Sequence, residues 1–290
     1  MIVEPLTHFD LELPIGRIRA VRNNIQASTR VLCIHGWLDN RASFLPMLPY
    51  FQDVECVAID LAGHGSSAHR DLNSLYHYID YVRDIKLILG ALQWEQCHLV
   101  GHSMGGSISL IAASAFPEHV QSLTMIDSLH PLARAPEDGP AMLQRSLHQF
   151  TRWDPYRKRS FPSLDDAISA RLVASPYPQT EASARLIMDY ATEKSDWAYT
   201  LLSDARLNFR SPLMLCHTQI EAFIRAVEQP ALSILATRGI IQNRQNIDQA
   251  LALFQDISAE YIEGGHHVHM EEPEEVVRTC LGFINKIENQ

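Results

Sequence analysis

The strongest indication of the fold class is the stretch His98-Leu99-Val100-Gly101-His102-Ser103-Met104-Gly105-Gly106. It joins a short apolar run to a segment of helical period that extends to Phe116, and Gly101 to Gly105 fit the pattern G-x-S-x-G. A serine on a sharp strand-to-helix turn needs small neighbours two positions away on either side, because larger ones would keep the turn from closing. The turn lifts the hydroxyl above the sheet, beside a helix N-terminus that favours negative charge. The pattern predicts that Ser103 is a nucleophile; the alternative is a glycine-rich turn with an incidental serine.

Short apolar runs alternate with helical segments on both sides of this turn. Such runs are typical of strands in a parallel sheet that is covered by helices on both faces. The predicted strands are Arg30–Ile34, 54–59, 98–100 and Val120–Ile126, and the predicted helices are 44–51, Tyr78–Leu92 and 104–116. A hairpin formed by Thr7–Leu13 and 15–21 is predicted to precede them.

The alternation stops after Asp127. From 130 to 229 the chain has only helical periodicity, interrupted by prolines, with predicted helices at 141–150, Leu164–Ala174, 181–192 and 214–227. The pattern resumes with a strand at Ala231–Ala236, a helix at 245–254, a strand at 259–262 and a final helix from Pro273 to about Ile287. We therefore expect an α/β core formed by 1–129 and 230–290, interrupted by a helical cap at 130–229.

Composition and charge exclude several classes of protein. The chain has 290 residues, of which 46% are hydrophobic, and a formal charge of −10. That charge offers no general attraction to nucleic acid or anionic lipid, and no run reaches the roughly 18 apolar residues of a membrane span. The five cysteines are scattered, and Met1 to Ile15 lack the pattern of a signal peptide. We expect reduced thiols and a cytoplasmic protein that binds neither nucleic acid nor membrane.

Acyl transfer to a serine needs two backbone amides that bind the oxyanion. One is the amide after the nucleophile, which belongs to Met104. The other comes from a loop after an earlier strand, and Ile34-His35-Gly36-Trp37 is such a loop. Because Gly36 lets the backbone turn the next amide inward, we expect Trp37 to supply the second donor. The alternative is that this segment only ends a strand.

The base for Ser103 must come from another loop at the same edge of the sheet. The segment Gly264-Gly265-His266-His267-Val268-His269 follows the last predicted strand and supplies histidines there. The residues alone do not choose between His266 and His267. A metal site is disfavoured, because the H-x-x-x-H spacing of a helical site is absent and no clear cluster elsewhere in the sequence offers a third ligand. We expect neither a metal nor a cofactor.

A carboxylate must hold the other nitrogen of the base. It commonly follows the strand after the cap, but Thr237 to Ile241 contain no acid, and the first acid is Asp248 in a predicted helix. Asp127, at the end of the strand before the cap, is the other candidate. A charge at the carboxyl end of a buried parallel strand needs a partner. We therefore predict that Asp127 is the acid; the alternative is an aspartate that caps the next turn.

Four segments resemble the α/β-hydrolase superfamily and, more narrowly, the serine-hydrolase-like proteins. They are HGWLDN at 35–40, DLAGHG at 60–65, GHSMGG at 101–106 and GHHVHMEEP at 265–273. The insertion has a weaker likeness to the family's helical cap at 204–207 and 211–212. The resemblance implies an α/β-hydrolase fold with a helical cap, and it is far less specific for the substrate than for the fold.

The resemblance also chooses the base. In superfamily loops of the form G-H-x-x-x-x-E-x-P the catalytic histidine stands seven residues before the proline, and counting back from Pro273 gives His266. The usual position of the acid aligns with Gly239, so this chain departs from the common pattern. The departure supports Asp127 and leaves a compromised triad as the alternative. Ser103 excludes the chemistry of haloalkane dehalogenases and epoxide hydrolases, whose nucleophile is an aspartate.

These residues predict a serine hydrolase that cleaves an ester, thioester, lactone or amide of a small-molecule acyl substrate through an acyl-enzyme. Two alternatives remain open, since fold alone does not determine the reaction. One is a ligand-binding or sensing protein with slow or no turnover, and the other is a non-hydrolytic lyase or perhydrolase. Six cap aromatics are candidates for an apolar lining, although each is more often part of the cap's own core: Trp153, Tyr177, Tyr190, Trp197, Tyr199 and Phe209.

Overall fold

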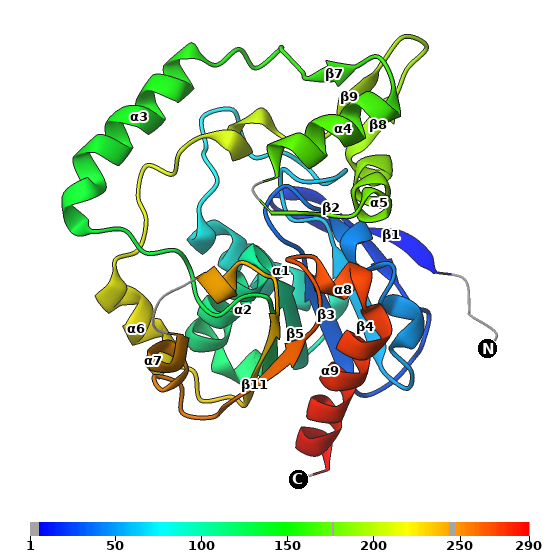
Figure 1. Ribbon diagram of the computed structural model, residues 1–290, viewed down its shortest axis with the longest axis vertical. Coiled ribbons are helices and arrows are strands. Elements are labelled where there is room, and N and C mark those ends of the chain that lie inside the picture. Colours follow the sequence, from blue (N-terminus) through cyan, green and yellow to red (C-terminus); the bar gives the residue numbers. More distant parts are fainter. Residues whose placement is uncertain (1–5, 176, 244–246, 290) are drawn as a thin grey trace.

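A mixed eight-stranded sheet forms the centre of the protein (Figure 1). The computed structural model describes residues 6–175, 177–243 and 247–289. The strand order is β1-β2-β4-β3-β5-β6-β10-β11; the pairs β1–β2 and β2–β4 are antiparallel, and all the others are parallel. The strands are β1 (Thr7–Leu13), β2 (Gly16–Arg22), β3 (Arg30–Ile34), β4 (Glu55–Ile59), β5 (Cys97–His102), β6 (Val120–Ile126), β10 (Ala231–Ala236) and β11 (Ile257–Ile262).

The sheet is covered on both faces. Along β3, Leu32 and Ile34 join one apolar cluster whereas Val31 and Cys33 join the other, because successive side chains of a strand point to opposite faces. On the first face lie α1 (Tyr78–Leu92) and α2 (Met104–Ala115), and on the second lies α9 (Pro273–Glu288). This arrangement confirms the predicted α/β class, because strands covered on both faces have uninterrupted apolar sequences.

One predicted core helix is absent from its expected place. Instead of a helix at 44–51, the chain forms two 3-10 turns, η1 (Arg41–Phe44) and η2 (Leu48–Tyr50). Pro46 and Pro49 have no N–H to donate, so a continuous α-helix cannot form there. Two later elements differ from prediction in their bounds: α7 is Ile247–Leu251, with residues 245 and 246 outside the described part, and β11 starts two residues before the predicted 259.

The insertion between β6 and β10 contains helices and a small sheet. The prediction that this stretch holds only helices is wrong, because β7 (Ser160–Phe161), β9 (Tyr199–Leu201) and β8 (Thr192–Lys194) form an antiparallel sheet. These strands have only two or three residues each, too few to show an alternating pattern. The helices are α3 (Gly139–Arg152), α4 (Leu164–Ala174), α5 (Glu181–Ala191) and α6 (His217–Arg225).

The whole insertion between β6 and β10 is called the cap below. Most of the cap lies above the main sheet in Figure 1, with α3 on one side and α4 and α5 on the other. A buried arginine ties it to the core. Arg206 donates to the backbone carbonyls of Arg70, Asp71 and Ser74 in the loop between β4 and α1, and it pairs with Asp204 at 2.6 Å. Over the described ranges, no helix has both the length and the apolarity needed to cross a membrane.

Candidate active site

Ser103 lies at the turn between β5 and α2 that was predicted for it. Its backbone has φ 52° and ψ −114°, a positive-φ conformation that residues other than glycine rarely adopt. A β-carbon on Gly101 would lie 2.4 Å from backbone atoms of Gly105, and one on Gly105 would lie 1.9 Å from the carbonyl oxygen of Ile34. Both positions therefore require glycine. The packing that excludes larger residues also holds the half-buried serine in its strained conformation.

Asp127 and His266 are in direct contact. Asp127 follows β6 and is fully buried, and its Oδ2 lies 2.7 Å from Nδ1 of His266. The same oxygen accepts the amide of Ile240 at 2.8 Å. A β-carbon on Gly239 would lie 2.1 Å from Oδ1 of Asp127, so only glycine leaves room for this carboxylate. The loop after β10 thus offers a glycine and an amide to an acid that comes from the neighbouring strand.

The register of the sheet brings Ser103 to the same place. His102 at the end of β5 pairs with Ile126 at the end of β6, so the next residues, Ser103 and Asp127, leave adjacent strands at one level. The Ser103 amide donates to the Ile126 carbonyl at 3.0 Å. The His102 ring lies 4.6 Å from the His266 ring between centroids, and its Nε2 donates to the His266 carbonyl at 2.8 Å. The three predicted residues therefore share one edge of the sheet.

Burial controls the protonation of His266. Removal from water lowers the pKa of the His266 imidazole to about 4; the hydrogen bond that His266 donates to Asp127 opposes this shift, and the nearby rings of His102 and His267 add to it. The ring is therefore neutral at neutral pH, with its Nδ1 proton facing Asp127. Its Nε2 is then free to accept a proton, which is the state that a general base requires.

The loop after β3 holds one peptide group in a fixed orientation. Nδ1 of His35 donates to the Gly36 carbonyl at 2.7 Å, while its Nε2 accepts the amide of Leu61 at 3.0 Å. The Asp39 amide also donates to the Gly36 carbonyl, at 3.2 Å. Because the peptide after Gly36 is trans, its N–H, which belongs to Trp37, points the opposite way. His35 is a positioning residue that the sequence did not reveal.

Trp37 and Met104 are the expected oxyanion donors. Among the described residues, neither backbone amide has a protein acceptor, so both remain available as donors. The side chain of Trp37 is 51% exposed, and its Nε1 donates to the carbonyl of Leu207 in the cap at 3.0 Å. Trp37 therefore connects the cap to the loop that carries one of the expected donors.

Tyr177 is the cap aromatic that contacts the site. Its ring centroid lies 5.3 Å from that of His266. The other five candidates have different surroundings: Trp153 packs edge-on against Phe209, Tyr190 packs near His8, Tyr199 lies beneath Lys194, and Trp197 is 88% exposed. Of the six aromatic residues, Tyr177 therefore supports the expectation that the cap gives the site an apolar lining.

A second polar cluster, which the sequence analysis missed, lies beside the predicted triad. Oδ2 of Asp39 is 3.2 Å from Nε2 of His267 and 3.5 Å from Nδ1 of His102. Arg171 of α4 pairs with the other oxygen of Asp39 and donates to the Leu38 carbonyl at 2.9 Å. These residues come from distant parts of the chain, so no local spacing could reveal them. The available signal was the presence of polar residues within loops that are otherwise buried.

Comparison with known proteins identifies the family of this chain. A family model described as alpha/beta hydrolase fold matches residues 29–273. The chain belongs to this family. The α/β hydrolase is 28% identical to a serine hydrolase-like protein of Danio rerio, over 96% of this chain and 88% of the relative. It is 29% identical to serine hydrolase-like protein 2 of Homo sapiens, over 96% of this chain and 94% of the relative.

Solved structures share the fold of this α/β hydrolase. A hypothetical protein from Pseudomonas aeruginosa PAO1 superposes with a TM-score of 0.89 at 30% identity, over 98% of this chain and 99% of the other. The thioesterase domain from the curacin biosynthetic pathway superposes with a TM-score of 0.82 at 22% identity, over 96% of this chain and 100% of the other. The predicted fold and the resemblance to serine-hydrolase-like proteins are both confirmed.

Proposed function

We propose that this α/β hydrolase is a serine hydrolase of carboxylic ester, thioester or lactone bonds. Ser103 is the nucleophile, His266 the base and Asp127 the acid of the proposed triad. The observation that carries the proposal is the 2.7 Å contact between Asp127 and a buried, neutral His266, beside a serine whose backbone is strained. The departure from the usual acid position does not weaken it, because Gly239 and Ile240 accommodate the carboxylate of Asp127.

The proposed reaction has two halves. In the first, the Ser103 hydroxyl attacks the acyl carbon while Nε2 of His266 takes its proton, and the amides of Met104 and Trp37 donate to the oxyanion. Collapse of this adduct expels the alcohol or thiol, which receives the proton from His266. In the second half, His266 takes a proton from the water that attacks the acyl-enzyme, and it gives this proton to the Ser103 oxygen as the acid is released. Asp127 stays ionised and stabilises the imidazolium in both halves.

The proposed substrate is a small molecule with an acyl group. Tyr177 beside His266 and the half-exposed ring of Trp37 offer apolar surface for that group. The proposed location is the cytoplasm, because all five cysteines are free thiols, four of them buried.

Labelling of Ser103 by a fluorophosphonate, run beside a chain-length series of p-nitrophenyl esters, tests the proposal. We expect stoichiometric labelling and hydrolysis in the natural chain. Ser103→Ala should lose both, with a fall in turnover of about 10⁴-fold or more and little change in melting temperature. Ser114→Ala, on the same helix α2, is the matched control. Equal turnover in Ser103→Ala would overturn the proposal, and labelling without hydrolysis would favour a binding or sensing protein.

A further inference from the structure

Asp39, His102 and His267 bring three potential metal ligands together beside the proposed catalytic histidine. Their ligand atoms all lie within 4.8 Å of one another, and all three residues are buried. Oδ2 of Asp39 is 3.2 Å from Nε2 of His267 and 3.5 Å from Nδ1 of His102. The loop after β3, the end of β5 and the loop after β11 each supply one ligand. The fold therefore creates a cluster that no local motif announces.

His102 and Asp39 face each other with two acceptor atoms. In the form of His102 that can bind a metal, one ring nitrogen carries a proton, and this nitrogen is Nε2, because it lies 2.8 Å from the His266 carbonyl oxygen, which can only accept. Nδ1 is then a bare lone pair, and among the described residues it has no hydrogen-bond partner. Its 3.5 Å separation from the carboxylate is longer than the roughly 2.7–2.9 Å of a charged hydrogen bond. It is close to the roughly 3.3 Å between two ligands of a tetrahedral zinc ion.

We propose that Asp39, His102 and His267 form a binding site for a divalent cation of the Zn²⁺ type. Two imidazoles and a carboxylate are a ligand set of this ion, and the fourth position is left for water. The hydrogen bond from His102 to a backbone carbonyl is of the kind that orients metal-bound histidines. His267 binds once its proton moves from Nε2 to Nδ1, an atom without a partner in the described part of the chain.

Gly36 leaves space at this site. A β-carbon at position 36 would lie 3.0 Å from Nδ1 of His102 and 3.1 Å from Oδ2 of Asp39. Any larger residue would therefore crowd the two ligand atoms that face each other. The glycine that turns the backbone toward the expected oxyanion donor thus also keeps the gap between these ligands open.

Arg171 competes with the proposed ion for the carboxylate of Asp39. Its guanidinium pairs with Oδ1 of Asp39 from α4 of the cap, and its side chain is 14% exposed. A divalent ion and a guanidinium on one carboxylate repel each other more strongly in a buried site than in water. The ion therefore binds more weakly while Arg171 is in place, and removal of that charge strengthens binding. The sign of this effect separates a metal site from an ordinary buried ion pair.

Occupation of the site should inhibit turnover, a consequence that rests on the proposed function. Ligand atoms up to 4.8 Å apart must approach to about 3.3 Å around one ion. His102 adjoins Ser103 and holds the His266 carbonyl, and Asp39 holds the Gly36 carbonyl of the predicted oxyanion loop. A displacement of about 1 Å in such groups costs about a hundredfold in rate. The bound ion would therefore act as an inhibitor.

Binding can be measured without turnover. Calorimetric titration of Zn²⁺ into the untagged full chain gives affinity and stoichiometry, and the visible spectrum of Co²⁺ reports tetrahedral coordination. We expect one ion per chain. Asp39→Asn and His267→Gln, which are close in size to the natural residues, should each weaken binding by at least about a hundredfold. Arg171→Gln should strengthen binding by about tenfold.

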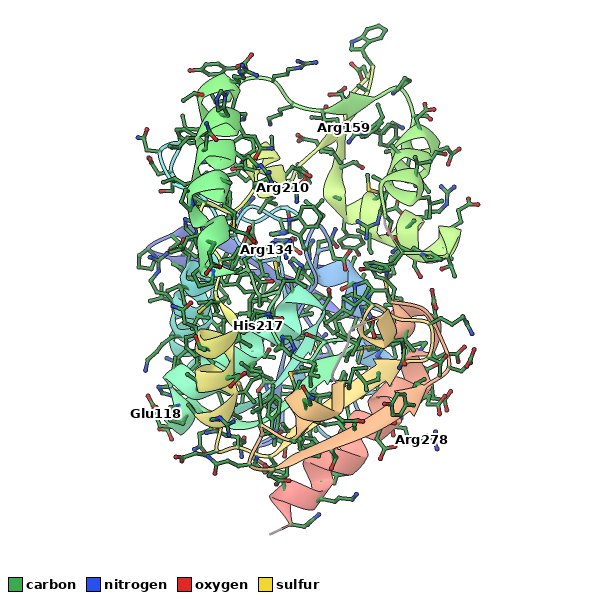
Figure 2. All side chains as sticks on the ribbon, turned by 60° about the vertical axis from the view of Figure 1, so that its left-hand side comes forward. Glu118, Arg134, Arg159, Arg210, His217 and Arg278 are labelled. Atoms are coloured by element: carbon green, nitrogen blue, oxygen red, sulfur yellow. The ribbon has the colours of Figure 1, made fainter. Side chains whose placement is uncertain are left out.

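Two variants serve as controls. His217→Gln tests for an adventitious ion at the surface, because exposed His217 on α6 (Figure 2) stands next to the thiol of Cys216. This variant should bind the ion normally if the ion occupies the proposed site. Ser103→Ala should also bind normally, so a failure of hydrolysis leaves the binding result intact. The proposed site is overturned if neither the natural chain nor Arg171→Gln binds Zn²⁺. It is also overturned if Zn²⁺ binding survives in Asp39→Asn or in His267→Gln, provided that the variant unfolds cooperatively on heating. Loss of binding in His217→Gln overturns it as well.

The inhibitory effect has its own readout. Saturating Zn²⁺ should slow fluorophosphonate labelling of Ser103 by about a hundredfold in the natural chain, and a chelator should restore the rate. His267→Gln should keep its own rate whether or not Zn²⁺ is present. An unchanged labelling rate in the saturated natural chain would overturn inhibition.

Discussion

The core and the cap meet beside Ser103, and they are held in place in different ways. In the core, His102, Ile126 and Ile234 pair across three adjacent parallel strands, so Ser103 and Asp127, which follow β5 and β6, emerge at one level. The strands are buried almost throughout. Moving Ser103 relative to Asp127 would therefore require breaking the hydrogen bonds of the sheet and opening a closely packed core.

The cap has a small core of its own, and it is attached to the main core by polar contacts and by Ile220 and Ile224 of α6, which belong to the main apolar cluster. Its apolar cluster is built around five buried residues: Ala167, Ile168, Ala184, Met188 and Ala191. Hydrogen bonds join it to the core, from Arg171 to Leu38, from Arg206 to Arg70 and from Trp37 to Leu207. The sheet therefore determines where the residues of the proposed triad meet. The cap is held by polar contacts and by the packing of α6 against the main apolar cluster, and under the proposed function it is the part that can vary to set substrate preference.

Among the substitutions that test this contrast between core and cap, Asp127→Asn should have the largest effect on catalysis. Asparagine keeps the volume but removes the charge, and its amide favours the wrong tautomer of His266. We expect kcat/KM for a p-nitrophenyl ester to fall about 10⁴-fold. Asp248→Asn is the matched control, because Asp248 is the first acid after β10 and stands on α7. Equal losses in the two variants would show that the acid is misassigned.

Arg206→Gln should have the next largest effect, on the attachment of the cap. The variant loses bonds to three core carbonyls and leaves Asp204 buried without its ion-pair partner. We expect the free energy of unfolding in urea to fall by about 3–5 kcal/mol. Arg238→Gln, which breaks an exposed pair with Glu263, should cost less than about 1 kcal/mol. Similar costs for both would mean that Arg206 does not anchor the cap.

Gly239→Ala tests whether the loop after β10 must leave room for Asp127. The added β-carbon would lie 2.1 Å from Oδ1 of Asp127, so the carboxylate has to move away from His266. A loss of about a hundredfold in kcat/KM is expected. Gly282→Ala on α9 meets nothing within 4 Å and should leave activity unchanged. Full activity of Gly239→Ala would show that the carboxylate does not depend on this space.

Residues that follow strands were predictable from the sequence, and contacts between loops were not. Ser103 belongs to a local pattern, and Asp127 stands at the end of a buried strand, where an acid needs a partner. The partner itself depends on which loops converge, and that depends on strand order. The meeting of Asp39, His102 and His267 therefore could not be predicted from any local motif. The short cap strands escaped for another reason, since tertiary contacts rather than local preference select them.

The pH profile sharpens the assignment of His266. Because burial lowers the pKa of His266 to about 4, hydrolysis should keep most of its rate at about pH 5.5 and fall as the pH approaches 4. The stability of the folded state depends on pH in the same direction. An unfolded histidine binds a proton near pH 6.5, whereas folded His266 does so only near 4, so the free energy of unfolding falls as the pH drops through this window. An acidic limb centred near pH 6.5 in kcat/KM would contradict the assignment.

Trp37→Phe should have the smallest effect and bears most directly on the boundary between core and cap. The variant keeps an aromatic side chain and the backbone amide that is expected to bind the oxyanion, but it loses the hydrogen bond from Nε1 to the Leu207 carbonyl. Because the side chain is 51% exposed, water replaces part of that bond, and we expect kcat/KM to fall by about fivefold or less. Trp197→Phe, at an 88% exposed position, should change nothing. A loss of a hundredfold in Trp37→Phe would mean that the cap helps to position the oxyanion loop, and that the catalytic geometry is not a property of the sheet alone.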